Sequence, residues 1–133
     1  MITLIIGKPD SGKSLMAEEL LSKNPNRDHI YLATMKVCDE AGIKRIEKHR
    51  KQREGKGFTT LELCYEISKA TSFIKDPQNS AVLLECISNL VGNEMYDNPE
   101  RSFLVSGEKK DTDTFVKLIS EDIKSLAQSV GNL

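Results

Sequence analysis

The amino-acid sequence predicts an α/β fold in which a mostly parallel sheet is covered by helices on both faces. Short apolar runs at residues 1–6, 29–34 and 80–86 have the length of buried strands, and stretches with helical spacing separate them. Strands that alternate with helices favour βαβ units with right-handed crossovers. The length of 133 residues suits one domain, so we expect a single domain over residues 1–133.

The first elements surround a glycine-containing loop. The run MITLII predicts a strand that stops at Gly7, and residues 14–23 predict a helix after the loop. This helix would pack on the sheet through Met16, Leu20 and Leu21. A polar turn at residues 24–28 then leads into the second predicted strand, which ends near Thr34.

The middle of the chain changes character. Residues 39–54 have few apolar side chains and many charges, which predicts a helix lying largely in solvent. Gly55 and Gly57 are its stop signals. The remaining elements are predicted as a brief strand at 59–63, a helix at 65–75, the third strand at 80–86, a helix at 87–97, an irregular charged stretch at 98–113 and a final helix over about 112–129. Asp111 or Thr112 would cap this last helix.

Composition excludes several classes of function. With 19 Lys+Arg against 20 Asp+Glu, and no Trp, the chain lacks the charge and the stacking surface of a nucleic-acid binder. No apolar stretch is long enough for a membrane span or resembles a signal peptide. The 3 cysteines are odd in number and form no close metal-binding pair, which argues against a disulfide framework. We therefore expect a cytoplasmic protein without nucleic-acid or membrane partners.

The segment GKPDSGKS matches the phosphate-binding pattern G-x-x-x-x-G-K-S/T. Gly7 and Gly12 let the backbone curl so that its N–H groups face an anion, and the N-terminus of the following helix adds partial positive charge. Lys13 would bridge the β- and γ-phosphates, and Ser14 would bind Mg²⁺. The alternative is a tight turn around a buried lysine stem. The pattern predicts a P-loop NTPase-like fold with nucleotide contacts at Gly7, Lys8, Pro9, Asp10, Ser11, Gly12, Lys13 and Ser14.

Glu85 ends the third predicted strand, after the apolar run AVLL. A P-loop protein holds its magnesium ion or its water with a carboxylate at this kind of position, where Asp is more usual. Glu85 is therefore a candidate metal ligand together with Ser14. The alternative is a strand end that merely turns polar.

His49 lies in the charged helix RIEKHRKQRE. Three interpretations remain open from the residues alone: a solvated helix face, a basic patch for nucleic acid, or a nucleophile that attacks a nucleotide phosphate. For the third, a neutral imidazole is abundant near pH 7, and neighbouring cations favour that form. Arg50, Lys51 and Arg53 would then hold the phosphate charge.

Five blocks together resemble a known enzyme family in their order and spacing: GKPDSGKS, YLAT, DE followed by KRIEKHRKQR, GFTTLE, and LLECIS. The resemblance, from Met1 to about Tyr96, is to the bifunctional adenosylcobinamide kinase/adenosylcobinamide-phosphate guanylyltransferases of cobalamin biosynthesis. It implies an α/β P-loop fold and a homo-oligomer. It also implies phosphorylation of adenosylcobinamide with ATP or GTP, and transfer of GMP from GTP to give adenosylcobinamide-GDP and pyrophosphate.

The resemblance assigns roles to individual positions. The guanylylated histidine of the family falls on His49, which with Lys13 forms the expected catalytic pair. Further nucleotide contacts fall on Thr34, Met35, Lys36, Arg50, Lys51, Gln52, Arg53, Glu62 and Glu85. The other histidine, His29, matches nothing functional, and we expect it to be structural.

The chain departs from the family pattern at several points. Ala41 and Gly42 replace the usual Glu and Met, and Phe58 replaces a Trp. Family members continue into a strand carrying N-E-V-G, and SVGNL resembles its lead-in, so we expect a sheet that is incomplete at the C-terminal end. Two alternatives follow: another small-molecule P-loop kinase, which would need Lys13 and Glu85 without His49, or a nucleotide-binding remnant of the family without turnover.

Overall fold

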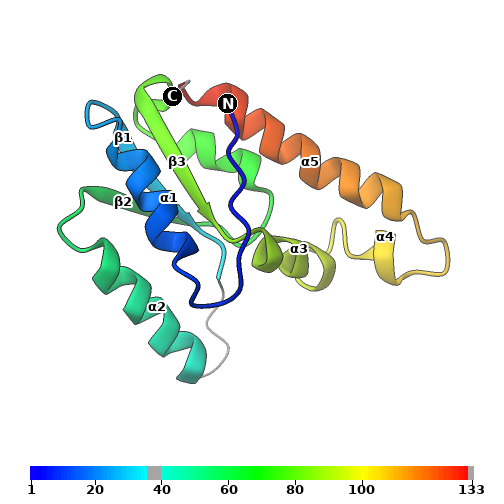
Figure 1. Ribbon diagram of the computed structural model, residues 1–133. Coiled ribbons are helices and arrows are strands. Elements are labelled where there is room, and N and C mark those ends of the chain that lie inside the picture. The colour runs from blue at the N-terminus through cyan, green and yellow to red at the C-terminus, as the bar shows by residue number, and fades with distance from the viewer. Residues whose placement is uncertain (36–39, 132–133) are drawn as a thin grey trace.

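The protein is built on a three-stranded sheet, shown in the computed structural model of Figure 1. The structure describes residues 1–35 and 40–131, without the side chains of residues 40–42, 46, 49 and 52. Strands β1 (Asp28–Ala33), β2 (Phe58–Glu62) and β3 (Ser80–Glu85) are parallel in the order β2-β1-β3. Ala33 pairs with both Glu62 and Glu85, so the carboxyl ends of all three strands lie at one edge.

Helices cover both faces of this sheet, as the sequence predicts. Because side chains alternate along a strand, Tyr31 and Leu32 enter different apolar clusters. Tyr31 packs on the face covered by α1 (Lys13–Ser22), where Leu21 is buried. Leu32 packs on the opposite face, against the 3₁₀ helix η1 (Ile67–Phe73) and the helices α3 (Ile87–Tyr96) and α5 (Thr112–Ser129). This confirms the predicted α/β class.

The other elements connect these layers. Helix α2 (Glu40–Arg53) follows β1, and its described side chains are exposed except for Arg53. Gly55 and Gly57 follow it, both at φ +77°, a conformation that favours glycine and ends the helix as predicted. The short elements are η2 (Pro77–Asn79) and α4 (Phe103–Ser106), the latter inside the stretch predicted to be irregular. The predicted helix at 65–75 is the 3₁₀ helix η1 instead.

The predicted strand at residues 1–6 is wrong. These residues are extended but have no assigned ladder pairing, and Met1, Ile2, Leu4 and Ile6 are exposed. In Figure 1 the segment runs in front of the sheet toward the loop before α1. An apolar run records a preference for burial, but a strand also requires a neighbour whose N–H and C=O groups are free at the right place. The run alone does not specify that neighbour.

Predictions about single side chains had mixed outcomes. Met16 is exposed, whereas Glu18 of the same helix is buried, so the predicted packing face of α1 is partly wrong. Glu18 can occupy that face because the Lys56 amine pairs with its carboxylate at 2.7 Å. Asp111 caps α5 as predicted, since its carboxylate accepts from the Thr114 N–H at 3.0 Å.

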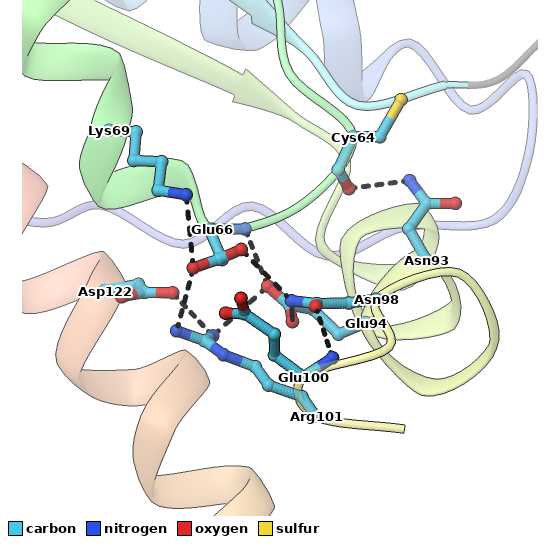
Figure 2. Close-up of polar contacts among 9 residues, drawn as sticks. All are labelled: Cys64, Glu66, Lys69, Asn93, Glu94, Asn98, Glu100, Arg101 and Asp122. Carbon is cyan, nitrogen blue, oxygen red and sulfur yellow. Dashed lines mark hydrogen bonds and ion pairs between the residues drawn. The ribbon is translucent and has the colours of Figure 1, made fainter. Parts of the chain in front are cut away.

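A polar cluster ties η1, α3 and α5 together, and Figure 2 shows its members. Arg101 donates to the carboxylates of buried Glu94 at 3.2 Å and of Asp122 at 2.7 Å, and it lies 4.0 Å from Glu66. Asn98 also donates to Glu94, at 3.0 Å. Because buried carboxylates are costly unless paired, the cluster fixes how these elements meet.

Asn93 attaches helix α3 to the carboxyl edge of the sheet. Its side-chain amide donates to the carbonyl oxygens of Thr34 at 2.7 Å and Cys64 at 2.8 Å, which follow β1 and β2.

Within residues 1–35 and 40–131, no helix is both long and apolar enough to cross a membrane.

Candidate functional site

The loop from Gly7 to Ser14 connects the extended N-terminal segment to α1. Gly12 stands at φ +88° just before the helix, and Asp10 is also left-handed at φ +58°. A Cβ built on Gly7 would lie 2.5 Å from the Ser11 hydroxyl oxygen, so a larger residue there would require the Ser11 side chain to shift. The turn is closed by Ser11 N–H donating to the Lys8 carbonyl oxygen at 3.2 Å. The loop thus has the tight curl that the sequence pattern predicts.

Lys13 is the first residue of α1, and its amine reaches back over the loop. The Nζ atom donates to the Lys8 carbonyl oxygen at 3.2 Å in an exposed contact. The N-terminus of α1 brings its unpaired backbone N–H groups and partial positive charge to the same place. An ammonium group and a helix N-terminus beside an exposed loop form an arrangement suited to an anion.

Ser14 and Glu85 meet at the carboxyl edge of the sheet. The Ser14 hydroxyl donates to Glu85 Oε1 at 2.7 Å, although the two residues are 71 positions apart. The second carboxylate oxygen, Oε2, accepts from the hydroxyl of Tyr31. Burial and this hydrogen bond raise the pKa of Tyr31 well above its ordinary value, so the hydroxyl stays protonated as a donor.

Helix α2 is attached to the loop and to strand β1 by charged side chains. Lys48 lies 3.3 Å from Asp10 of the loop, in a pair too exposed to contribute much energy. At the C-terminal end of α2 the Arg53 guanidinium lies 3.4 Å from the centroid of the Tyr31 ring and is only 7% exposed. Figure 1 shows α2 below α1 and the sheet. The basic helix therefore ends on the residue that holds Glu85.

Comparison with known proteins identifies the family. Residues 3–132 match the family described as "Cobinamide kinase / cobinamide phosphate guanyltransferase". The chain belongs to this family. It is also 33% identical over 97 residues to "Bifunctional adenosylcobalamin biosynthesis protein CobU" of Escherichia coli (strain K12), a match that covers 73% of this chain and 51% of that protein. The chain thus spans about half the length of this relative.

The other residues expected to contact nucleotide in this family lie in different surroundings. Thr34 is fully buried, and its hydroxyl donates to the Cys86 carbonyl oxygen at 2.9 Å and accepts from the Cys86 N–H at 2.9 Å. Arg50 and Glu62 form an exposed pair at 3.0 Å. Met35 is half-buried and Lys51 is exposed. Lys36 and the side chains of His49 and Gln52 lie outside the described residues.

The structure therefore brings the side chains of Ser14 and Glu85 together. By contrast, Thr34 and Arg53 are buried and contact other residues of the protein. As nucleotide contacts, all of these residues stay predictions. His29 behaves as expected of a structural residue, since its ring Nε2 lies 2.9 Å from the Asn24 carbonyl oxygen.

Sequence reasoning missed three residues at this candidate site: Tyr31, Glu18 and Lys56. Tyr31 is only 3% exposed, and Glu18 pairs with Lys56 at 2.7 Å. One signal was available, because a tyrosine in a strand with both faces covered needs a partner for its hydroxyl. That partner, Glu85, belongs to a strand 54 residues later in the chain.

Proposed function

We propose that the protein binds a magnesium–nucleoside triphosphate at the Gly7–Ser14 loop, phosphorylates adenosylcobinamide, and transfers GMP from GTP to the product. The observation that carries the proposal is the 2.7 Å contact of Ser14 with Glu85, directly beside the loop and Lys13, in a chain of this family. The homo-oligomer implied by the resemblance and the expected cytoplasmic location stay predictions.

The kinase step uses the loop and the start of α1. Backbone N–H groups and the Lys13 ammonium bind the β- and γ-phosphates, which neutralises charge that builds up on their oxygens. Mg²⁺ prefers oxygen ligands and usually takes only one or two from protein carboxylates and hydroxyls beside the phosphates. Ser14 and Glu85 fit that requirement, because they present adjacent hydroxyl and carboxylate oxygens. A bound Mg²⁺ would neutralise part of the charge on the phosphate oxygens.

The guanylyl step assigns the nucleophile to His49. Its imidazole attacks the α-phosphorus of GTP, a P–N bond forms, the bond to the β-phosphate oxygen breaks, and pyrophosphate leaves. A phosphate oxygen of adenosylcobinamide phosphate then attacks the same phosphorus and the imidazole departs, giving adenosylcobinamide-GDP. Arg50 and Lys51, which follow His49 in the last turn of α2, stabilise the phosphoryl charge.

Two labelled nucleotides test both steps. Adenosylcobinamide is incubated with ATP labelled in its γ-phosphate, and its phosphate ester is incubated with GTP labelled in its α-phosphate. Label should enter the cobinamide in both reactions. Lys13→Ala should lower the rate of the first transfer by about a hundredfold or more. His49→Ala should lower the rate of the second transfer by about the same factor. His29→Ala is the matched control and should retain both.

Each rival gives a different result. Label that enters another small molecule and not adenosylcobinamide would indicate a different P-loop kinase. Nucleotide binding that is lost in Lys13→Ala, with no transfer of either label by the unmodified protein, would indicate a binding protein without turnover. Either outcome contradicts the proposed function.

A further inference from the structure

We propose that Tyr31 is a positioning residue for the metal-binding carboxylate: its hydroxyl holds Glu85 against Ser14, and its ring connects Glu85 to the end of helix α2. The inference rests on the proposed function, since it concerns the same magnesium site. It assigns a role to a residue that neither the phosphate-binding pattern nor the family resemblance singles out.

The backbone places Tyr31 and Glu85 where their side chains can meet. In the ladder between β1 and β3, Tyr31 pairs with Leu83 and Ala33 pairs with Glu85. Glu85 is therefore a diagonal neighbour of Tyr31, two positions farther along the adjacent strand and on the same face of the sheet. Long side chains reach across such diagonals. Since β1 is the central strand, Tyr31 is held by ladders on both sides.

The two carboxylate oxygens of Glu85 accept hydrogen bonds from different hydroxyl groups. Oε2 of Glu85 accepts from Tyr31, while Oε1 accepts from Ser14. A glutamate has three rotatable side-chain bonds, so an unheld carboxylate would adopt many orientations and lose entropy when it bound a cation. With Oε2 held, Oε1 already points at the Ser14 oxygen. A magnesium ion then meets a preorganised pair of ligands.

The ring of Tyr31 is itself held by two neighbours. The Arg53 guanidinium lies 3.4 Å from its centroid, and Phe58 meets it edge-on at 6.3 Å with an interplanar angle of 88°. Both Tyr31 and Arg53 are nearly inaccessible to solvent, which strengthens a cation–π contact. Arg53 is the last residue of α2, the helix that carries His49. Displacement of this helix therefore acts on Glu85 through one ring.

The test measures how strongly nucleotide binding depends on Mg²⁺. A fluorescent GTP analogue is titrated into the full chain without free Mg²⁺ and at increasing Mg²⁺. Tyr31→Phe keeps the ring and removes only the hydroxyl. We expect unchanged affinity without Mg²⁺, and an increase of about 3- to 10-fold in the Mg²⁺ concentration for half-maximal effect. Tyr96→Phe, at an exposed tyrosine, is the matched control and should leave both values unchanged.

Arg53→Gln tests the second link with the hydroxyl left in place. The half-maximal Mg²⁺ concentration should rise here too, by about 2- to 5-fold. An equal loss of affinity with and without Mg²⁺, at an unchanged half-maximal Mg²⁺ concentration, would instead make Arg53 a direct phosphate ligand and would overturn the coupling. A Mg²⁺ dependence of Tyr31→Phe equal to that of the unmodified protein would overturn the role of Tyr31 alone. Failure of the unmodified protein to bind nucleotide would overturn the proposed function as well.

Discussion

Lys56 Nζ lies 2.7 Å from Oε2 of Glu18, which joins the turn after α2 to the buried face of α1. The Glu18 side chain is only 5% exposed, whereas that of Lys56 is 42% exposed. One partner can therefore leave for water and the other cannot. Because buried Glu18 needs a cation, its pairing with Lys56 helps to fix the position of α2. The contact of Arg53 with Tyr31 does the same at the end of the helix.

Replacing Lys56 by Met should destabilise the fold, because it leaves the buried carboxylate of Glu18 without its cation. We expect a loss of about 1–2 kcal/mol in the free energy of unfolding, reduced from the cost of a fully buried pair by the exposure of Lys56. Chemical denaturation followed by circular dichroism measures it. Lys75→Met, at an exposed lysine, is the control. An equal effect of the two substitutions would show that the ion pair is unimportant.

Arg101 should be the most sensitive charged residue on the opposite side of the sheet (Figure 2). Arg101→Met leaves the carboxylates of Glu94 and Asp122 close together and largely buried. Breaking such a group from one side costs about 3–5 kcal/mol. Equilibrium unfolding should show this loss, while Lys117→Met should change stability by less than about 0.5 kcal/mol, because its pair with Glu121 is exposed. A loss in Arg101→Met as small as that of the control contradicts the account.

Asp111 gives the start of α5 a dependence on pH. Hydrogen bonds from the Thr114 hydroxyl and N–H lower the pKa of Asp111 below its ordinary value of 3.8. A lowered folded-state pKa means that the stabilisation is present above the ordinary pKa and is lost as pH falls through the folded value. Asp111→Ala should therefore lower Tm near neutral pH, and the difference from the unmodified protein should shrink as the pH falls below 3.8 and through the lowered folded-state pKa.

Thermal unfolding at several pH values decides this prediction. Asp113→Ala, in the same first turn but without the cap contact, serves as the control and should show a smaller difference in Tm. A difference for Asp111→Ala that stays constant down to the lowest pH would mean that the carboxylate charge is irrelevant to the cap.

Much of the fold can be predicted from the sequence because its signals are local. The apolar runs that form β1 and β3 and the spacing of Phe115, Ile119 and Leu126 in α5 each record which face is buried. The glycine pattern of the loop likewise depends on residues that are close in sequence. Residues 1–6 show where this reasoning stops, since their pattern is that of a strand but their pairing depends on a distant neighbour.

The candidate site divides in the same way. Ser14 and Glu85 were predicted as metal ligands from a motif and from a strand end, and the structure places their side chains in contact. The sequence does not show that Arg53 is buried while the neighbouring basic residues are exposed. A basic run has the same composition whether its side chains face solvent or an aromatic ring. The contacts of Tyr31 with Glu85 and Arg53 join three separate segments, and no periodicity in the sequence encodes them.

If the chain carries out the guanylyl step, His49 in helix α2 becomes covalently guanylylated, and mapping the modified residue by mass spectrometry reveals it. The protein is incubated with GTP and Mg²⁺, digested under mildly alkaline conditions that preserve a phosphoramidate, and analysed by tandem mass spectrometry. We predict a GMP adduct on the peptide containing His49 and none on the peptide containing His29. An unmodified His49 under conditions where GTP is bound would contradict it.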